Sequence, residues 1–137
     1  MSNAFAKPLP VPTPATAPYW DAARDHQLVA PRCNACGKLF FHPQAQCPNC
    51  ISDDIGWETM SGRGTVYSCT VIRQPGHPAF QHDVPYVFAI IELEEGIRMA
   101  SNVVGCAPED VHPDQKVEVV FEEASPEITL PKFRLAK

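Results

Sequence analysis

Runs rich in β-branched and aromatic residues alternate with short turn segments through the second half of the chain. Val, Ile, Tyr and Phe dominate these runs, and such residues favour extended strands. The pattern predicts five strands, at residues 64–73, 86–93, 97–104, 116–122 and 129–135. Glu94-Glu95-Gly96 predicts a three-residue hairpin between the second and third, because glycine readily takes the left-handed conformation required there. Five strands with a break between the third and fourth are typical of a small Greek-key barrel of the OB type.

The first residues of the chain lack this pattern. Residues 1–18 hold five of the fifteen prolines, which favours extended backbone without a core, so we interpret residues 1–17 as a disordered proline-rich tail. Residues 18–27 predict a short helix with Tyr19, Trp20 and Ala23 on one face. Two adjacent aromatic side chains need a packing surface, which either the rest of this chain or a partner protein could supply.

Four cysteines stand in two pairs, Cys33-Asn34-Ala35-Cys36 and Cys47-Pro48-Asn49-Cys50, with ten residues between the pairs. This spacing lets both thiolates of one turn face a single ion, and four thiolates suit a tetrahedral Zn²⁺. Gly37 can supply the positive φ that such a turn needs, and residues 38–41 are expected to run as a strand towards the second pair. Because four cysteines complete the coordination shell, we expect the zinc to be structural.

Three other states of the cysteine pairs are alternatives to zinc. They are reduced pairs without metal, a redox disulfide, and iron, since Cys-x-x-Cys-Gly and Cys-Pro-x-Cys also occur in rubredoxins. A thioredoxin-type site needs a Cys-x-x-Cys that opens a helix in a βαβ unit, a pattern that this sequence lacks. The segment between the pairs is short for a rubredoxin, so zinc is favoured over iron.

The charge and composition restrict the function classes. A net charge of −5 over 137 residues repels a phosphate backbone, which counts against a general nucleic-acid binder. No apolar run approaches the ~18–20 residues of a membrane helix, and no signal-peptide pattern opens the sequence. Cysteine pairs without a secretory signal favour the reducing cytoplasm. The alternative function is a single-stranded nucleic-acid-binding module, in which Tyr67, Phe88 and Phe121 on the barrel strands could stack on bases.

Together these patterns predict a mainly β protein. The expected architecture is a short N-terminal helix and a rubredoxin-like zinc ribbon, followed by a five-stranded OB-fold barrel. The expected boundaries are a tail at residues 1–17, the helix plus zinc ribbon at 18–60, and the OB-fold domain at 61–137.

This arrangement resembles the DUF35 family, whose members combine a zinc ribbon with an OB-fold and are associated with acyl-CoA metabolism. The resemblance covers about residues 19–135. One departure is His112-Pro113-Asp114-Gln115 before the fourth strand, where the family usually has a glycine turn. The matching motifs are Tyr19-Trp20, both cysteine pairs, Ser-Gly-Arg-Gly-Thr-Val-Tyr-Ser at residues 61–68, and Leu-Pro-Lys-Phe-Arg at residues 130–134.

The resemblance implies a subunit that is not an enzyme by itself. Such a subunit forms a hetero-oligomer with a thiolase-like enzyme (a thiolase, a retro-aldolase or an acyltransferase) and helps to bind or channel a CoA thioester. On this reading the helix with Tyr19 and Trp20 contributes to docking of the partner. The sequence shows no clear catalytic set. His77, His82 and Asp83 share a proline-rich loop and could form an acid–base pair, but a polar surface loop is the favoured interpretation.

CoA binding requires cations for the phosphates of the cofactor. Arg73, at the end of the first predicted strand, and Lys132 and Arg134, in the last, are the candidate CoA-binding residues.

Overall fold

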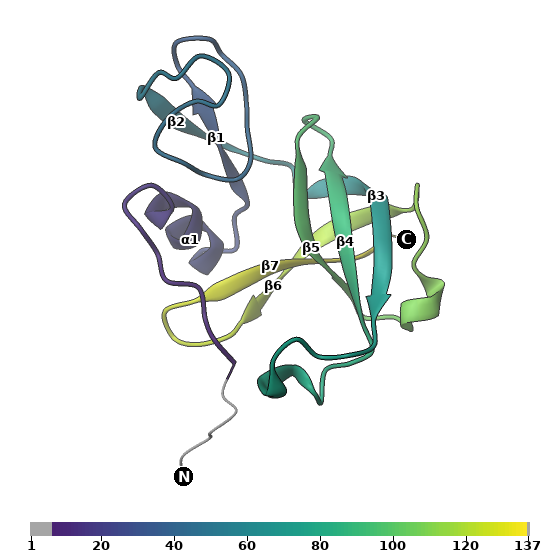
Figure 1. Ribbon diagram of the computed structural model, residues 1–137. Helices are drawn as coiled ribbons and strands as arrows, with labels where there is room; N and C mark the ends of the chain where they lie inside the picture. The colour runs from purple at the N-terminus through teal and green to yellow at the C-terminus, as the bar shows by residue number, and fades with distance from the viewer. Residues whose placement is uncertain (1–6, 137) are drawn as a thin grey trace.

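A computed structural model describes residues 7–136, so residues 1–6 of the predicted tail lie outside the described part of the chain. Helix α1 spans Ala17–Arg24, and short 3₁₀ turns lie at Pro78–Phe80 and Pro108–Asp110. No helix in residues 7–136 is long and apolar enough to cross a membrane. The strands are β1 (Val29–Cys33), β2 (Ile55–Thr59), β3 (Arg63–Ile72), β4 (Tyr86–Leu93), β5 (Arg98–Val104), β6 (Lys116–Glu123) and β7 (Thr129–Leu135) (Figure 1).

Strands β3 to β7 form a closed barrel with the order β3-β4-β5-β7-β6. β6 pairs back onto β3, and every pairing is antiparallel except that of β5 with β7. This confirms the predicted five-stranded barrel. The bounds of β4 and β7 agree with the prediction, those of β5 and β6 differ by one residue at one end, and β3 begins and ends one residue earlier than predicted.

Buried and more exposed residues alternate along the barrel strands, and the buried ones form the barrel core. In β4 the inward residues Val87, Ala89, Ile91 and Leu93 are buried, and the residues between them are more exposed. Phe133 of β7 is fully buried and belongs to the same core. Most of this core comes from the barrel strands, and it continues into Tyr19, Leu28 and Ala30 of the helix and the ribbon.

Two turns hold the strands in register. Gly96 takes a φ of 99°, and its amide donates to the Leu93 carbonyl, which confirms the predicted hairpin. Asp114 takes a φ of 74° and donates its amide to the Val66 carbonyl. Aspartate tolerates this left-handed conformation better than most residues, so Asp114 takes the positive φ that glycine would supply in the family's usual turn.

β1 and β2 pair antiparallel and form the two-stranded sheet of the ribbon. The predicted strand at residues 38–41 is wrong, because that segment makes only one isolated bridge, between Leu39 and Arg32. Phe40 packs with cysteines, whereas Phe41 packs against the main core. Because the side chains of Phe40 and Phe41 pack into two separate clusters, the backbone of this segment is irregular. The second strand of the ribbon sheet is instead β2, which was not predicted.

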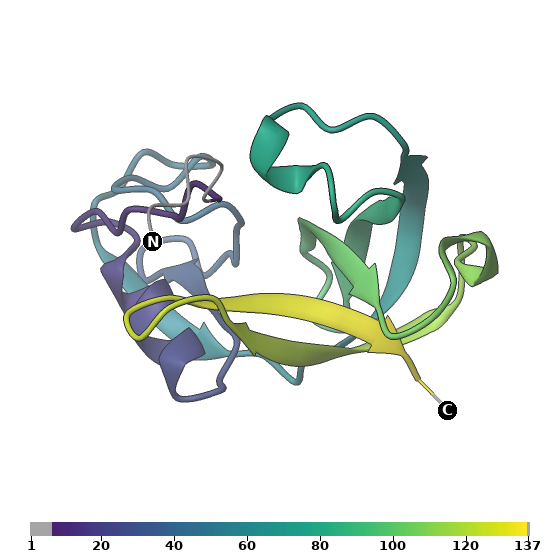
Figure 2. The same ribbon diagram turned by 90° about the horizontal axis from the view of Figure 1, so that it is seen from below.

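Helix α1 lies between the ribbon and the far end of the β6–β7 hairpin (Figures 1 and 2). Tyr19 and Ala23 are its buried residues. The helix ends earlier than predicted because His26 takes a φ of 58° and the Gln27 amide bonds back to the Ala22 carbonyl. Such a left-handed residue ends a helix by satisfying its last carbonyl groups.

Candidate metal centre and candidate binding residues

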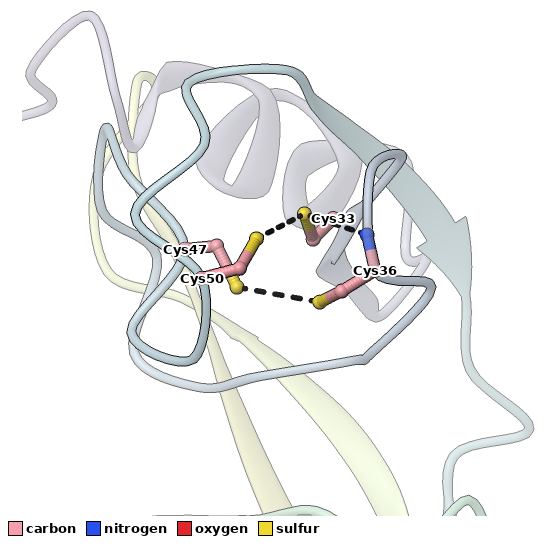
Figure 3. Close-up of side chains that lie close together, drawn as sticks. All are labelled: Cys33, Cys36, Cys47 and Cys50. Atoms are coloured by element: carbon pink, nitrogen blue, oxygen red, sulfur yellow. Dashed lines mark hydrogen bonds between the residues drawn. The ribbon is translucent and has the colours of Figure 1, made fainter.

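The four paired cysteines meet at one end of the ribbon. Their Sγ atoms all lie within 4.8 Å of one another, with Cys33 and Cys50 3.5 Å apart and Cys36 and Cys47 3.7 Å apart (Figure 3). A tetrahedral ion with metal–sulfur bonds of about 2.3 Å requires sulfur–sulfur distances of about 3.8 Å. All four cysteines are free of disulfides. The set therefore fits a single Zn²⁺.

Each cysteine pair is held by a tight backbone turn. In the first, Gly37 takes a φ of 79° and donates its amide to the Cys33 carbonyl, as predicted. In the second, Ile51 takes a φ of 68° and donates its amide to the Cys47 carbonyl. A β-branched residue is rarely found at positive φ, so the backbone of this turn is strained at Ile51. The sequence did not reveal this strain.

Backbone amides point at the sulfur atoms. The Cys36 amide lies 3.4 Å from Cys33 Sγ, and the Asn49 amide lies 3.3 Å from Cys47 Sγ. Hydrogen bonding by the Lys38 backbone lowers the pKa of Cys36 to about 6. Donors directed at sulfur stabilise the thiolate, which is the form that binds metal.

The cysteines are also the centre of a small apolar cluster. Cys33 and Cys47 are buried with Phe40, and Cys36 and Ile55 pack against them; we refer to these five residues as the knuckle cluster. The cluster is separate from the main core and too small to be stable alone. A Zn²⁺ held by four thiolates would cross-link it, with no coordination position left for a substrate.

The three predicted CoA-binding cations do not form one site. Lys132 pairs with Glu122, and Arg134 pairs with Glu118 at 2.7 Å. Arg73 follows the end of β3, and β3 is not a neighbour of β7 in the closed barrel, because β6 separates the two strands on one side and β4 and β5 separate them on the other. Lys132 and Arg134 thus share one strand, and Arg73 is separate from them.

Tyr19 and Trp20 pack within the chain. Tyr19 is 7% exposed and meets Trp20 and Phe41 edge to face, with ring centroids 4.9 Å and 5.5 Å apart. Burial raises the pKa of Tyr19 above its usual range. Of the two packing surfaces considered from the sequence, this chain itself covers Tyr19, and Trp20 remains half-buried.

Tyr19, Trp20 and Lys132 line one cavity of about 350 Å³, which we refer to as the helix cleft. It is bounded by α1, by residues 41–43 of the ribbon, and by β5 and β7. Sequence reasoning missed its other walls, such as Phe41, Ala100 and Leu130. No local pattern could have found them, because the cleft exists only where three separate segments meet.

Other candidate groups are engaged elsewhere. His77 accepts a hydrogen bond from the Ala79 amide, and Asp83 pairs with Lys7 at 2.6 Å. The alternative base-stacking residues are partly covered, since the Arg98 guanidinium lies 3.8 Å from the centre of the Tyr67 ring and His26 stacks on Phe121. Phe88 is 41% exposed. The three candidate stacking residues thus lie on three different strands, β3, β4 and β6, and two of them already contact another side chain.

Two family models match the chain in tandem. Residues 20–56 match the model described as "ChsH2, rubredoxin-like zinc ribbon domain", and residues 57–122 match "ChsH2, C-terminal OB-fold domain". These matches agree with the ribbon and barrel seen in the structure.

Named relatives extend the comparison. The chain is 42% identical over 95% of its length to a probable enoyl-CoA hydratase alpha subunit of Thermomonospora curvata, and spans 40% of that protein. It is 33% identical over 71% of its length to the benzoylsuccinyl-CoA thiolase subunit BbsA of Geobacter metallireducens, of which it spans 58%. Among solved structures it is similar to a chain of the "Ltp2-ChsH2(DUF35) aldolase", with 41% identity and a TM-score of 0.84 over 94% of this chain and 100% of that one.

Proposed function

The chain belongs to the DUF35 family of zinc-ribbon and OB-fold proteins, and on this premise we propose that it is an accessory subunit of an enzyme that acts on CoA thioesters. The partner in this proposal is a thiolase-like enzyme, with which the chain forms a hetero-oligomer. The chain is not catalytic by itself, and it helps to bind or channel the thioester. A reducing cytoplasm, in which the four thiols stay available for metal, is the proposed compartment.

The names of the relatives support this proposal. Two of them are named as subunits of enzymes whose names contain a CoA thioester, and a matching structure is named as an aldolase of two components. The chain spans only about two fifths of the hydratase subunit, so that protein's own reaction is not transferred to it.

The residues of this chain have supporting roles in the proposal. The four cysteines hold a structural zinc that fixes the ribbon, and the barrel presents β7 with its cations. We keep the proposed division into a helix-plus-ribbon unit at residues 18–60 and an OB-fold unit at 61–137. Tyr19 is buried, so a docking role for the aromatic pair would rest on the half-buried Trp20.

The positively charged side chains of β7 are better suited to bind the phosphates of CoA than its carbonyl groups. Lys132 and Arg134 are already paired with Glu122 and Glu118; the Arg134 pair is exposed to solvent, and the Lys132 pair is partly exposed. Accessible ion pairs contribute little stability, so a phosphate of CoA can replace a carboxylate at small cost. Arg73, which follows the end of β3, would contact a different part of the cofactor.

Co-expression with a thiolase-like protein from the same genome tests the proposal. We expect the two proteins to elute together in size-exclusion chromatography at micromolar concentration, and the purified chain alone to leave acyl-CoA substrates unchanged. Separate elution together with full activity of the thiolase-like protein alone would show that the chain is not its subunit.

A further inference from the structure

We infer that the helix cleft binds the apolar acyl group of a CoA thioester, with the rest of the CoA molecule outside the cleft. This inference rests on the proposed function and deepens it, since it assigns one part of the ligand to one part of the chain. The cleft is bounded by the three structural units of the molecule, namely α1, the ribbon and the barrel.

The walls of the cleft are largely apolar. Tyr19 and Trp20 come from α1, Phe41 from the ribbon, Ala100 from β5 and Leu130 from β7. The edge-to-face packing of Tyr19 on Trp20 and Phe41 stiffens the helix side of the cavity. A rigid apolar cavity of this kind loses little entropy when it accepts a hydrocarbon group.

Two of the polar side chains that line the cleft, Ser101 and Asn102, already have partners within the chain. Ser101 donates its hydroxyl to the Pro131 carbonyl at 2.9 Å, and Asn102 donates its amide to the Val87 carbonyl at 2.8 Å. A polar ligand would have to replace these interactions, whereas a hydrocarbon leaves them intact. The arrangement therefore favours the acyl end of a thioester over its nucleotide end.

The size of the cleft fits part of a CoA thioester. A volume of about 350 Å³ lies at the lower end of the ~300–1,000 Å³ that is typical of small-molecule sites. An acyl group of moderate length fits this volume, and an entire acyl-CoA does not. Lys132, which lines the cleft, lies on the same strand as Arg134, so polar parts of the ligand outside the cleft would meet the cations of β7.

Trp20 provides a direct probe of occupancy. The chain has two tryptophans, and Trp57 does not line the cleft, so the full-length Trp57→Phe variant leaves Trp20 as the single fluorophore. The ligands for titration are CoA, acetyl-CoA and octanoyl-CoA. We expect octanoyl-CoA to change the Trp20 emission and to bind at least tenfold more tightly than acetyl-CoA, because each buried methylene adds to the affinity.

Two substitutions that each introduce a phenylalanine ring distinguish the effect of filling the cleft from the effect of changing the barrel surface elsewhere. In the Trp57→Phe background, Ala100→Phe would fill the cleft from β5, and Thr70→Phe would add the same ring at an exposed position on β3. We expect Ala100→Phe to abolish the preference for octanoyl-CoA, and Thr70→Phe to keep it. Leu130→Ala is the complementary variant, since it enlarges the cleft and should increase the preference for chains longer than octanoyl.

The outcomes distinguish this inference from the proposed function. Equal affinity for acetyl-CoA and octanoyl-CoA, or an unchanged preference in both Ala100→Phe and Leu130→Ala, would overturn the acyl site. If Ala100→Phe instead prevents co-elution with the thiolase-like protein and leaves octanoyl-CoA binding intact, the cleft is a docking surface and the inference is wrong, while the subunit proposal stands. Failure of the wild-type chain to co-elute tests only the subunit proposal.

Discussion

The rings of Tyr19 and Phe41 meet edge to face, with their centroids 5.5 Å apart, and this contact joins α1 to the segment between the two cysteine pairs. Tyr19 also belongs to the continuous apolar core that includes Val66 and Phe133 of the barrel. One buried aromatic residue therefore connects the helix, the ribbon and the barrel. Its hydroxyl group makes this connection sensitive to alkaline pH.

Tyr19→Phe should make the chain more resistant to alkaline unfolding. Burial raises the pKa of Tyr19 above the ordinary value of 10.0, so the folded state holds the phenol proton more tightly than the unfolded state. Stability is then complete below pH 10 and is lost as the pH rises towards the folded-state pKa, by at most about 1.4 kcal/mol per pH unit. Urea unfolding between pH 9 and 11.5 measures this slope.

The control for this experiment is Tyr67→Phe, which removes the phenol of a residue that is 51% exposed. It should show the wild-type pH dependence. A wild-type slope in Tyr19→Phe as well would mean that another group controls alkaline unfolding.

Cys33→Ser and Cys50→Ser should each lose the single zinc ion that we expect per chain. Loss of the metal removes the cross-link of the knuckle cluster, so the ribbon should unfold, while the barrel should keep much of its structure because its strands supply most of the main core. Elemental analysis of reduced protein gives the metal content, and circular dichroism during heating reports on the two units.

Cys106→Ser is the matched control, because Cys106 lies outside the cysteine cluster, and it should retain one zinc. Iron in the wild-type protein would favour the rubredoxin-like alternative. Simultaneous loss of ribbon and barrel in Cys33→Ser would show that they unfold as one cooperative unit.

Gly64→Ala should destabilise the barrel by about 1–3 kcal/mol. A Cβ atom at Gly64 would lie 2.6 Å from the Glu92 carbonyl oxygen and 3.0 Å from Ile91 Cγ2, so β3 and β4 would have to move apart. Gly76→Ala is the control, because a Cβ atom there meets no atom within 4 Å. Urea unfolding of both variants tests this, and equal stability of the two would contradict a close approach at Gly64.

Lys132→Ala and Arg134→Ala should each raise the KM of the assembled enzyme for its CoA substrate by about tenfold, because each would remove one charged contact to a phosphate. Co-elution with the partner should stay unchanged. Arg24→Ala, which removes a surface cation of α1 that pairs with Asp21, is the control and should leave the KM unaltered. A lowered kcat with an unchanged KM in the β7 variants would contradict a role in substrate binding.

The sequence by itself determined the local features of this protein. The spacing of the cysteines placed four thiols in two turns, and the runs of β-branched and aromatic residues located the barrel strands, with β4 and β7 at their observed bounds. Gly37 and Gly96 were identified as left-handed residues because few other residues adopt that conformation readily. Each of these features is set by residues close together in the chain.

Only the tertiary structure decided the features that join distant segments. β2 has little strand pattern of its own and forms because β1 offers it an edge, and residues 38–41 stay irregular because Phe40 and Phe41 pack into different clusters. The meeting of α1, the ribbon and the barrel at the helix cleft follows from the same assembly. Contacts of this kind depend on the packing of the whole chain, because no local segment contains both partners.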